Sequence, residues 1–227
     1  MASKAKSSDM KVRKKKWVDI ISPSFGDKVI GHTHVFETAN AVGKTLKINL
    51  MSLSGDPRKQ STDMHFLCEK QKGDSAVEAK ITGYVMQQPN LKKLVRRGKT
   101  KIQDSFKCKT QDNVPVIVKI FAITRKNVNN SITGSIRTKI KLNAVNMIAK
   151  IPFEKIIMDT ISGKIQKDIK SIVGKIYPLR VLELSCIKIF NPKKGKFEIP
   201  IEEEKISKTD EQESEEEDTE EEEIKQK

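Results

Sequence analysis

Long apolar runs and aromatic side chains are scarce in this sequence, and each scarcity excludes a class of protein. Aromatic residues make up only 5 % of the 227 residues, so any core must be built from aliphatic side chains. The run 114–123 is interrupted by Lys119 and is too short to cross a bilayer. The lysine-rich N-terminus lacks the apolar segment of a secretory signal. We therefore expect a cytoplasmic protein with no membrane partner.

Metal-binding patterns are also lacking. The three cysteines are Cys68, Cys108 and Cys186. They form no Cys-x-x-Cys pair and their number is odd, which disfavours both a disulfide framework and a zinc ribbon and favours a reducing compartment. His32, His34 and His65 are zinc ligands in principle, but no cysteine or carboxylate is spaced to complete a site. We expect surface histidines and no metal.

Catalytic motifs are missing as well. Gly43-Lys44-Thr45 is similar to the end of a phosphate-binding loop, but Thr38 stands where the first glycine of that loop is required, and the segment leads into a strand. No nucleophile elbow, paired catalytic carboxylates or Cys–His motif can be identified. The sequence predicts no enzyme, no cofactor and no small-molecule substrate.

Positive charge, by contrast, is in large excess. The formal net charge is +14, although residues 201–227 hold 14 of the 30 acidic side chains and only 4 of the 44 lysines and arginines. The other 200 residues therefore carry 40 basic and 16 acidic groups, a net charge of +24. A folded body this basic repels itself unless a polyanion neutralises it, and nucleic acid is the commonest such partner. A solvated lysine-rich surface is the less favoured alternative.

The middle of the chain has the period-two alternation of β-strands. Strands are predicted at 45–53, 62–69, 77–86, 100–110 and 114–124. The strands at 100–110 and 114–124 are predicted to form a hairpin, because Asp112-Asn113 tolerates the left-handed backbone of a tight turn. Five or six such strands are enough to close a small barrel.

Helical periodicity follows the strands. Apolar residues recur at helical spacing from Ile132 to Ile151, and again at intervals of four from Ile157 to Val173, with Gly163 dividing the second run. Residues 179–190 return to alternation and are expected to rejoin the sheet. The fold class is thus α+β, a small β-barrel-like domain with packed C-terminal helices.

The predicted boundaries follow from these patterns. They are a disordered basic arm at 1–16, a body at 17–199 (β-barrel 17–129, helices 130–177, returning strand 178–190) and an acidic low-complexity tail at 200–227. The tail either shields the basic body and contacts basic neighbours, or is a solubilising segment without partners; both readings stand equally.

Basic residues form three main clusters. The first runs from Lys11 to Lys16, beside Trp17, and includes Lys14, Lys15 and Lys16; the second comprises Lys92, Lys93, Arg96, Arg97, Lys99 and Lys101; the third comprises Arg125, Lys126, Arg137, Lys139 and Lys141. Arginine pairs phosphates bidentately and stacks on exposed bases, so RNA contact is favoured for the second and third clusters. A weaker fourth group, Lys188, Lys193, Lys194 and Lys196, fits RNA contact and a solvated face equally well. Trp17 could stack on a base, but the apolar residues after it favour a core anchor.

Five colinear stretches carry a family resemblance. They read KKKWVDIISPSFGDKVIG at 14–31, GKTLKINLMSLSGDPRK at 43–59, LVRRGKTKIQDSFKCKTQDN at 94–113, AITRKNVNNSITGSIRTKI at 122–140 and GKIYPLRVLELSCIKIF at 174–190. In this order they resemble the ribosomal protein S-three-a-e family, also called the eS-one family, of the archaeal and eukaryotic small subunit. The resemblance spans residues 13–192. It departs at Asp112-Asn113, where the family has Asp-Gly, and at Trp17-Val18, where it has Trp-Tyr.

The resemblance implies a non-catalytic constituent of the small ribosomal subunit, with a barrel-like domain bound to ribosomal RNA on the platform near the messenger exit. It implies neighbouring platform proteins, and messenger RNA near the exit, as further partners. The residues expected to contact RNA are Lys14, Lys15, Lys16, Trp17, Lys92, Lys93, Arg96, Arg97, Lys99, Arg125, Lys126, Arg137 and Lys139. Two alternatives fit the same charge: a free RNA-binding factor or chaperone that touches ribosomes transiently, and an RNA-modifying enzyme, for which no cofactor site is found.

Overall fold

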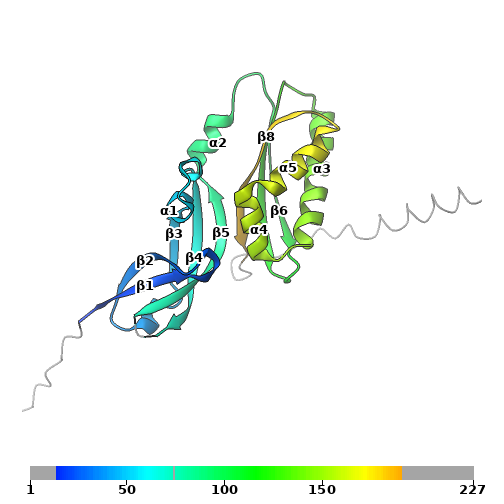
Figure 1. Cartoon of the computed structure of the whole chain (residues 1–227). Helices are drawn as coiled ribbons and strands as arrows, with labels where there is room; N and C mark the ends of the chain where they lie inside the picture. Colours follow the sequence, from blue (N-terminus) through cyan, green and yellow to red (C-terminus); the bar gives the residue numbers. More distant parts are fainter. Residues whose placement is uncertain (1–13, 74, 191–227) are drawn as a thin grey trace, which may run out of the picture. The chain divides into compact units, whose positions relative to one another are not determined.

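Eight strands joined in one sheet, with five α-helices attached, make up the described part of the chain, residues 14–73 and 75–190 of a computed structural model (Figure 1). The strands are β1 (Lys16–Ser22), β2 (Lys28–Val35), β3 (Thr45–Asn49), β4 (Thr62–Lys72), β5 (Ala76–Met86), β6 (Lys101–Lys109), β7 (Pro115–Thr124) and β8 (Leu179–Ile189). The α-helices are α1 (Leu50–Ser54), α2 (Gln88–Leu94), α3 (Asn130–Ala149), α4 (Phe153–Ser162) and α5 (Lys164–Gly174), with short 3₁₀ turns at Pro23–Phe25, Thr38–Ala41 and Pro57–Lys59. The α+β class is confirmed. Residues 1–13 of the predicted arm, the lysines at 193–196 and the predicted tail lie outside the described residues.

The sheet divides at β5. One edge of β5 pairs with β4 along its length. The other edge is shared: β1 runs parallel to its beginning, with Ile20 opposite Val77, and β8 runs antiparallel to its end, with Gly83 opposite Lys188. The strand order is therefore β2-β1-β5-β8-β7-β6, with β4 and then β3 branching from the other edge of β5.

The branch β2-β1-β5-β4-β3 curls until its two end strands meet through side chains. Leu46 of β3 lies 3.7 Å from the position that a Cβ on Gly31 of β2 would occupy. Nearby, Lys44 Nζ donates a hydrogen bond of 3.2 Å to Thr33 Oγ1. Among the described residues no backbone ladder joins β2 to β3, so backbone pairing does not complete the predicted barrel.

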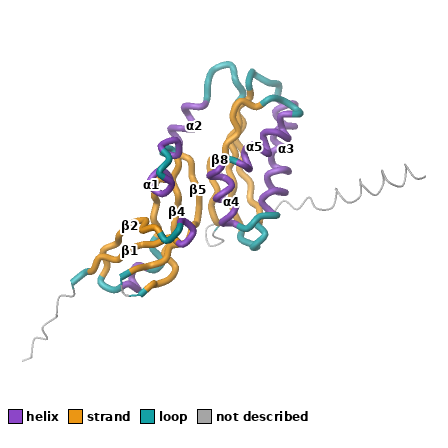
Figure 2. Tube along the Cα trace, viewed as in Figure 1, coloured by secondary structure: helices purple, strands orange, loops and turns teal. Residues whose placement is uncertain are grey.

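Helices α3 and α5 cover one face of the β6–β8 part of the sheet, and α4 packs beside α5 and contacts β5 (Figure 2). The buried side chains of α3 are Thr133, Ile136, Ile140, Ala144 and Ile148. Their spacing of three and four residues is that of a helix with one apolar stripe toward the core. Gly163, with φ of 77°, separates α4 from α5 as predicted, because a left-handed residue ends a helix. In the described residues no helix is both long and apolar enough to span a membrane.

The predicted hairpin is confirmed residue by residue. Lys101 lies opposite Ile123 and Lys109 opposite Pro115, without a register shift between them. Asn113 has a φ of 55°, the left-handed backbone that the turn was expected to need. The returning strand is also confirmed, because β8 pairs with both β7 and β5.

The strand predicted at 45–53 is wrong in its second half, where the chain forms α1 instead. The side chain of Asn49 accepts a hydrogen bond of 2.9 Å from Met51 N and caps the helix, and Gly55, with φ of 75°, ends it. Leu50 and Leu53 are buried by one helical turn. Four residues are too few to distinguish this pattern from alternation.

The core position favoured for Trp17 is also wrong, because its side chain is 68 % exposed. The next residues, Val18 and Ile20, are buried on the inner face of β1. Since successive side chains of a strand point to opposite faces, Trp17 must point outward.

Candidate nucleic-acid interface

Two basic clusters that are far apart in the sequence meet at one end of the strands β6, β7 and β8. Because Lys101 begins β6 opposite Ile123 near the end of β7, the segment entering β6 and the segment leaving β7 lie side by side. The cationic residues here are Arg96, Arg97, Lys99, Lys101, Arg125, Lys126 and Arg180. We call this surface the basic end. Apart from Lys99 and Arg180, which are half-buried, all of them are exposed.

A buried hydroxyl holds the two segments together. Thr124 Oγ1 accepts a hydrogen bond of 3.0 Å from Thr100 N and donates one of 2.6 Å to the carbonyl oxygen of Lys126. In turn, Thr100 Oγ1 donates to Asn127 Oδ1 at 2.8 Å and accepts from Val128 N at 3.0 Å. These hydrogen bonds therefore fix the segment that enters β6 against the segment that leaves β7, and so bring the two groups of cations together.

Arg180 adds a charge that the sequence analysis missed. Leu179 lies opposite Thr124, so the first residues of β8 reach the same end of the sheet. Partial desolvation, together with the charges of Arg180 and Arg96, lowers the pKa of Lys99 below its ordinary value. The Nη1 atom of Arg180 is buried without a hydrogen-bond partner in the described part of the protein. A bound anion would relieve this crowding of like charge.

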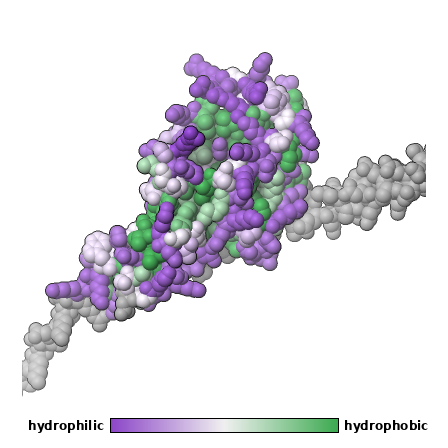
Figure 3. Space-filling view, viewed as in Figure 1, coloured by the Kyte–Doolittle hydropathy of each residue, from purple (hydrophilic) through white to green (hydrophobic). Residues whose placement is uncertain are grey.

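Helix α2 carries two further lysines to the basic end. Leu91 packs against Phe121 and Ile123 in a small apolar cluster on the outer face of the sheet. Lys92 and Lys93 occupy the last turn of α2 and are exposed. Figure 3 shows hydrophilic side chains gathered where α2 and the following loop lie in Figure 1. The second predicted cluster is thus brought together from a helix, a loop and a strand.

Helix α3 begins at Asn130, four residues after Lys126. Its first turn contains no acidic residue, and its N-cap, Asn129, makes no side-chain capping bond. The free N–H groups and the positive end of the helix dipole therefore add to the potential of the basic end. Lys139 is exposed farther along this helix.

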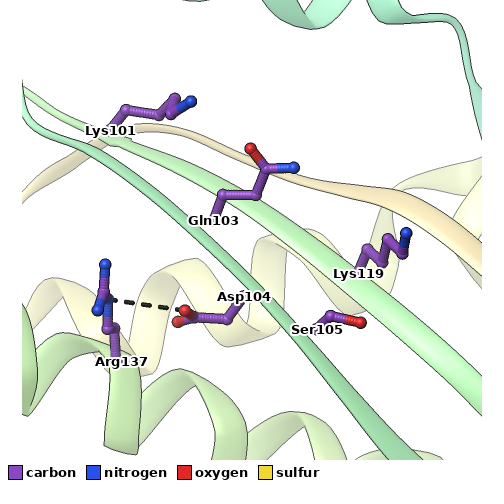
Figure 4. Close-up of a pocket in the computed structure, with 6 residues that line it drawn as sticks. All are labelled: Lys101, Gln103, Asp104, Ser105, Lys119 and Arg137. Carbon is purple, nitrogen blue, oxygen red and sulfur yellow. Dashed lines mark ion pairs between the residues drawn. The ribbon is translucent and has the colours of Figure 1, made fainter.

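Arg137 is engaged within the protein. Its Nε lies 3.6 Å from Asp104 Oδ1, and the two side chains are 52 % and 29 % exposed (Figure 4). They line a shallow hollow of about 450 Å³ together with Lys101, Gln103, Ser105 and Lys119. An ion pair this exposed stabilises a protein by only about 0–1 kcal/mol, so Asp104 does not prevent Arg137 from pairing with a phosphate.

The first predicted cluster does not join the basic end. Lys16 begins β1 opposite Val35, and β1 pairs with the opposite end of β5 from β8. Trp17 stacks on His34, with ring centroids 4.8 Å apart and planes at 27°. Lys15 Nζ lies over the ring of Phe36, 5.2 Å from its centroid. These residues form a separate surface on the outer side of the β1–β2 hairpin.

A row of basic side chains crosses the sheet at the junction of β5 and β8. His65 lies opposite Lys47 on one side and Gly83 on the other, and Gly83 lies opposite Lys188. Burial, followed by the charges of Lys188 and Lys47, lowers the pKa of His65. Among the described residues no three His, Cys, Asp or Glu side chains gather as a metal site would require.

The cysteines are free thiols. Cys68 and Cys108 are buried in the main core. Burial raises the pKa of Cys108 to about 12 and also raises the pKa of Cys68 and of Cys186. A thiol that ionises so reluctantly is a poor nucleophile, so these residues serve packing.

Comparison with known proteins places the sequence in a family. A family model described as the Ribosomal S3Ae family matches residues 2–192. A Methanobrevibacter smithii protein named small ribosomal subunit protein eS1 is 28 % identical over 180 residues, which cover 79 % of this chain and 93 % of the relative. Proteins of the same name from Saccharolobus islandicus and Saccharolobus solfataricus are each 26 % identical over 190 residues, covering 83 % of this chain and 91 % of the relative.

Proposed function

The chain belongs to the ribosomal S3Ae family, and from this premise we propose that it is a structural constituent of the small ribosomal subunit that binds ribosomal RNA through its basic end. The relatives named as small-subunit proteins match over most of the chain, and the residues matched by the family model include every described strand and helix. The observation that carries the proposal is the convergence of two basic clusters on one surface, held by Thr100 and Thr124. No catalytic role is proposed.

The basic end suits a phosphate backbone. Arginine presents a planar fork that pairs phosphate oxygens bidentately, and each contact releases a condensed counterion. The contacts we propose here are Lys92, Lys93, Arg96, Arg97, Lys99, Arg125, Lys126, Arg137 and Lys139, with Arg180 added by the fold. Because backbone contacts fix register and carry no sequence information directly, these residues position the protein on folded RNA.

The site on the subunit is part of the proposal. The family resemblance implies the platform near the messenger exit, in the cytoplasm, beside other platform proteins and messenger RNA. We infer that Lys14, Lys15 and Lys16 contact phosphates of the RNA, while the sheet that β1 joins fixes their position. The charge of residues 201–227 suits a contact with basic neighbours or shielding of the body before assembly.

Sedimentation of a cell lysate through a sucrose gradient tests the proposal, with quantitative detection of this chain in each fraction. We expect about one copy per small subunit, retained in moderate salt and released by mild ribonuclease treatment, since RNA contacts hold it. A protein found mainly at the top of the gradient would contradict the ribosomal assignment and make a free RNA-binding factor the better description.

A further inference from the structure

An exposed aromatic pair marks the outer side of the β1–β2 hairpin. Trp17 is the only tryptophan of the chain, and its side chain is 68 % exposed. His34, directly opposite on β2, covers one face of the indole at a centroid distance of 4.8 Å. Phe36, 45 % exposed, follows two residues farther along, beneath the ammonium group of Lys15.

The core does not account for these rings. Val18, Ile20 and Val35 anchor the hairpin from its inner face and are almost completely buried. The outer rings contribute a cross-strand contact, but most of the indole surface stays in water. Contiguous exposed apolar groups mark binding surfaces, whereas hydrophobic residues exposed singly are ordinary.

We propose that Trp17, backed by His34, is a stacking platform for an unpaired base of RNA. This inference rests on the proposed RNA-binding function and assigns a ligand to the one part of the predicted interface that lies apart from the basic end. Sites for single-stranded nucleic acid combine aromatic rings, on which bases stack, with cations that follow the backbone. Lys15 supplies such a cation, since its Nζ lies over the ring of Phe36, and Lys14 and Lys16 flank it in the sequence.

The charges on the hairpin indicate the direction of the strand. Asp19 lies two residues beyond Trp17 on the same face, and its carboxylate is hydrogen-bonded to His32 Nδ1 at 2.6 Å. A phosphate is repelled on that side and attracted on the side of Lys15 and Phe36. The nucleotides flanking the stacked base therefore run from Trp17 toward Phe36.

The platform selects RNA whose bases are free. Bases in a duplex are stacked on one another and present only their edges, whereas loops, bulges and ends can offer a π-face to an aromatic side chain. Every base has such a face, so the platform tolerates different sequences. The basic end, in contrast, needs only phosphates and accepts helical RNA.

The single tryptophan makes the test direct. The full chain is titrated with a short oligouridylate and with an RNA duplex of equal length, and the intrinsic fluorescence of Trp17 is followed. We expect the single strand to quench the fluorescence and the duplex to bind without comparable quenching. Equal quenching by the two RNAs, or none by either, would overturn the proposal.

Variants separate stacking from charge. Trp17→Ala should weaken binding of labelled oligouridylate roughly tenfold or more, and Trp17→Phe should retain most of the affinity. The salt dependence should not change in Trp17→Ala, whereas Lys15→Gln should reduce the slope of log affinity against log salt by about 0.7. Leu142→Ala, at an exposed apolar residue of α3, is the matched control and should have no effect.

The two proposals fail in different ways. The titration uses free RNA, so a wrong ribosomal assignment leaves its result intact. Unchanged oligouridylate affinity in Trp17→Ala would overturn the platform while leaving the basic end untouched. If that variant kept its affinity for RNA and yet lost incorporation into small subunits, the rings would contact a protein neighbour, which also overturns the proposal.

Discussion

Gly83 of β5 and Lys188 of β8 lie opposite each other with no room for an added methyl group between them. A Cβ on Gly83 would stand 2.9 Å from Lys188 Cγ and 2.9 Å from the carbonyl oxygen of Ile187. The ladder between β5 and β8 comprises only the residues opposite Gly83, Tyr84 and Val85. Among the described glycines, Gly83 is the one where an added Cβ would come within 3.0 Å of other atoms, and it lies in the short ladder that joins the two parts of the sheet.

Gly83→Ala should therefore destabilise the protein. The added Cβ forces β5 and β8 apart, because one of the atoms it meets is backbone, and overpacking of this kind costs about 1–3 kcal/mol. Urea denaturation followed by circular dichroism measures the change in the free energy of unfolding.

The control for this prediction is Gly134→Ala in α3, where an added Cβ has no neighbour within 4 Å. The same substitution there should raise the free energy of unfolding by about 0.5–1 kcal/mol, because alanine is the better helix former. If Gly83→Ala and Gly134→Ala changed the free energy of unfolding in the same direction, the steric explanation would be refuted.

Much of the fold could be predicted from local patterns in the sequence. The hairpin β6–β7 and the strands β4, β5 and β8 follow from alternation, and Gly163 divides α4 from α5 as its position predicts. Strand β1 was not predicted, since Lys16 and Asp19 mask its alternation. Helix α2 also went unnoticed, because Leu91 and Leu94 alone give too short a pattern for a helix. The branching at β5 depends on contacts between distant residues, which no local pattern contains.

The imidazole of His65 is expected to titrate below pH 6.5, its ordinary value, because burial and then Lys188 and Lys47 disfavour the charged form. In this case the unfolded chain binds the proton more tightly than the folded protein does. The contribution to stability is present above pH 6.5 and is lost as the pH falls from there toward the lower pKa of the folded state. NMR titration of the imidazole, together with denaturation at several pH values, measures both effects.

Substitution of the neighbouring lysines checks the cause. Lys188→Gln should raise the pKa of His65 more than Lys47→Gln does, because Lys188 has the larger effect. Neither variant should restore the ordinary value, since burial remains. A titration midpoint of His65 at or above pH 6.5 in the unmodified protein would contradict the effect of burial and of the two lysines.

The site was predictable in its parts and not in its arrangement. Arg96 and Arg125 stood out as charge clusters, but only the pairing of β6 with β7 shows that they share a surface. Arg180 is a lone arginine in an apolar strand, and no clustering signal marks it. Trp17 could have been placed on the outer face by extending the alternation of Val18 and Ile20 backward by one residue.

Thr124→Val should loosen the basic end without changing its charge. Valine keeps the shape of the buried side chain but leaves Thr100 N–H and the carbonyl oxygen of Lys126 without their partner, which costs about 1–3 kcal/mol. Affinity for duplex RNA should fall, while the slope of log affinity against log salt stays the same because no cation is lost. Binding is measured by fluorescence anisotropy at several salt concentrations.

Thr138→Val is the matched control for this change. Its hydroxyl is exposed on α3 and bonds only to the carbonyl oxygen of Gly134, in its own helix. The effect on both stability and RNA binding should be small. An equal loss of affinity in the two variants would mean that the hydroxyl of Thr124 does not organise the surface.

Reversal of two charges at the basic end should impair incorporation into small subunits without unfolding the protein. Arg96 and Arg97 are exposed and lie in the loop before β6, so Arg96→Glu with Arg97→Glu removes no buried contact. The variant should move toward the top of a sucrose gradient while its circular dichroism spectrum is unchanged. Lys155→Glu with Lys167→Glu makes the same change of charge on exposed positions of α4 and α5, outside the set of residues that defines the basic end. If both double variants lost incorporation equally, total charge would govern binding; because the fold gathers its cations at one end, we expect only the first to do so.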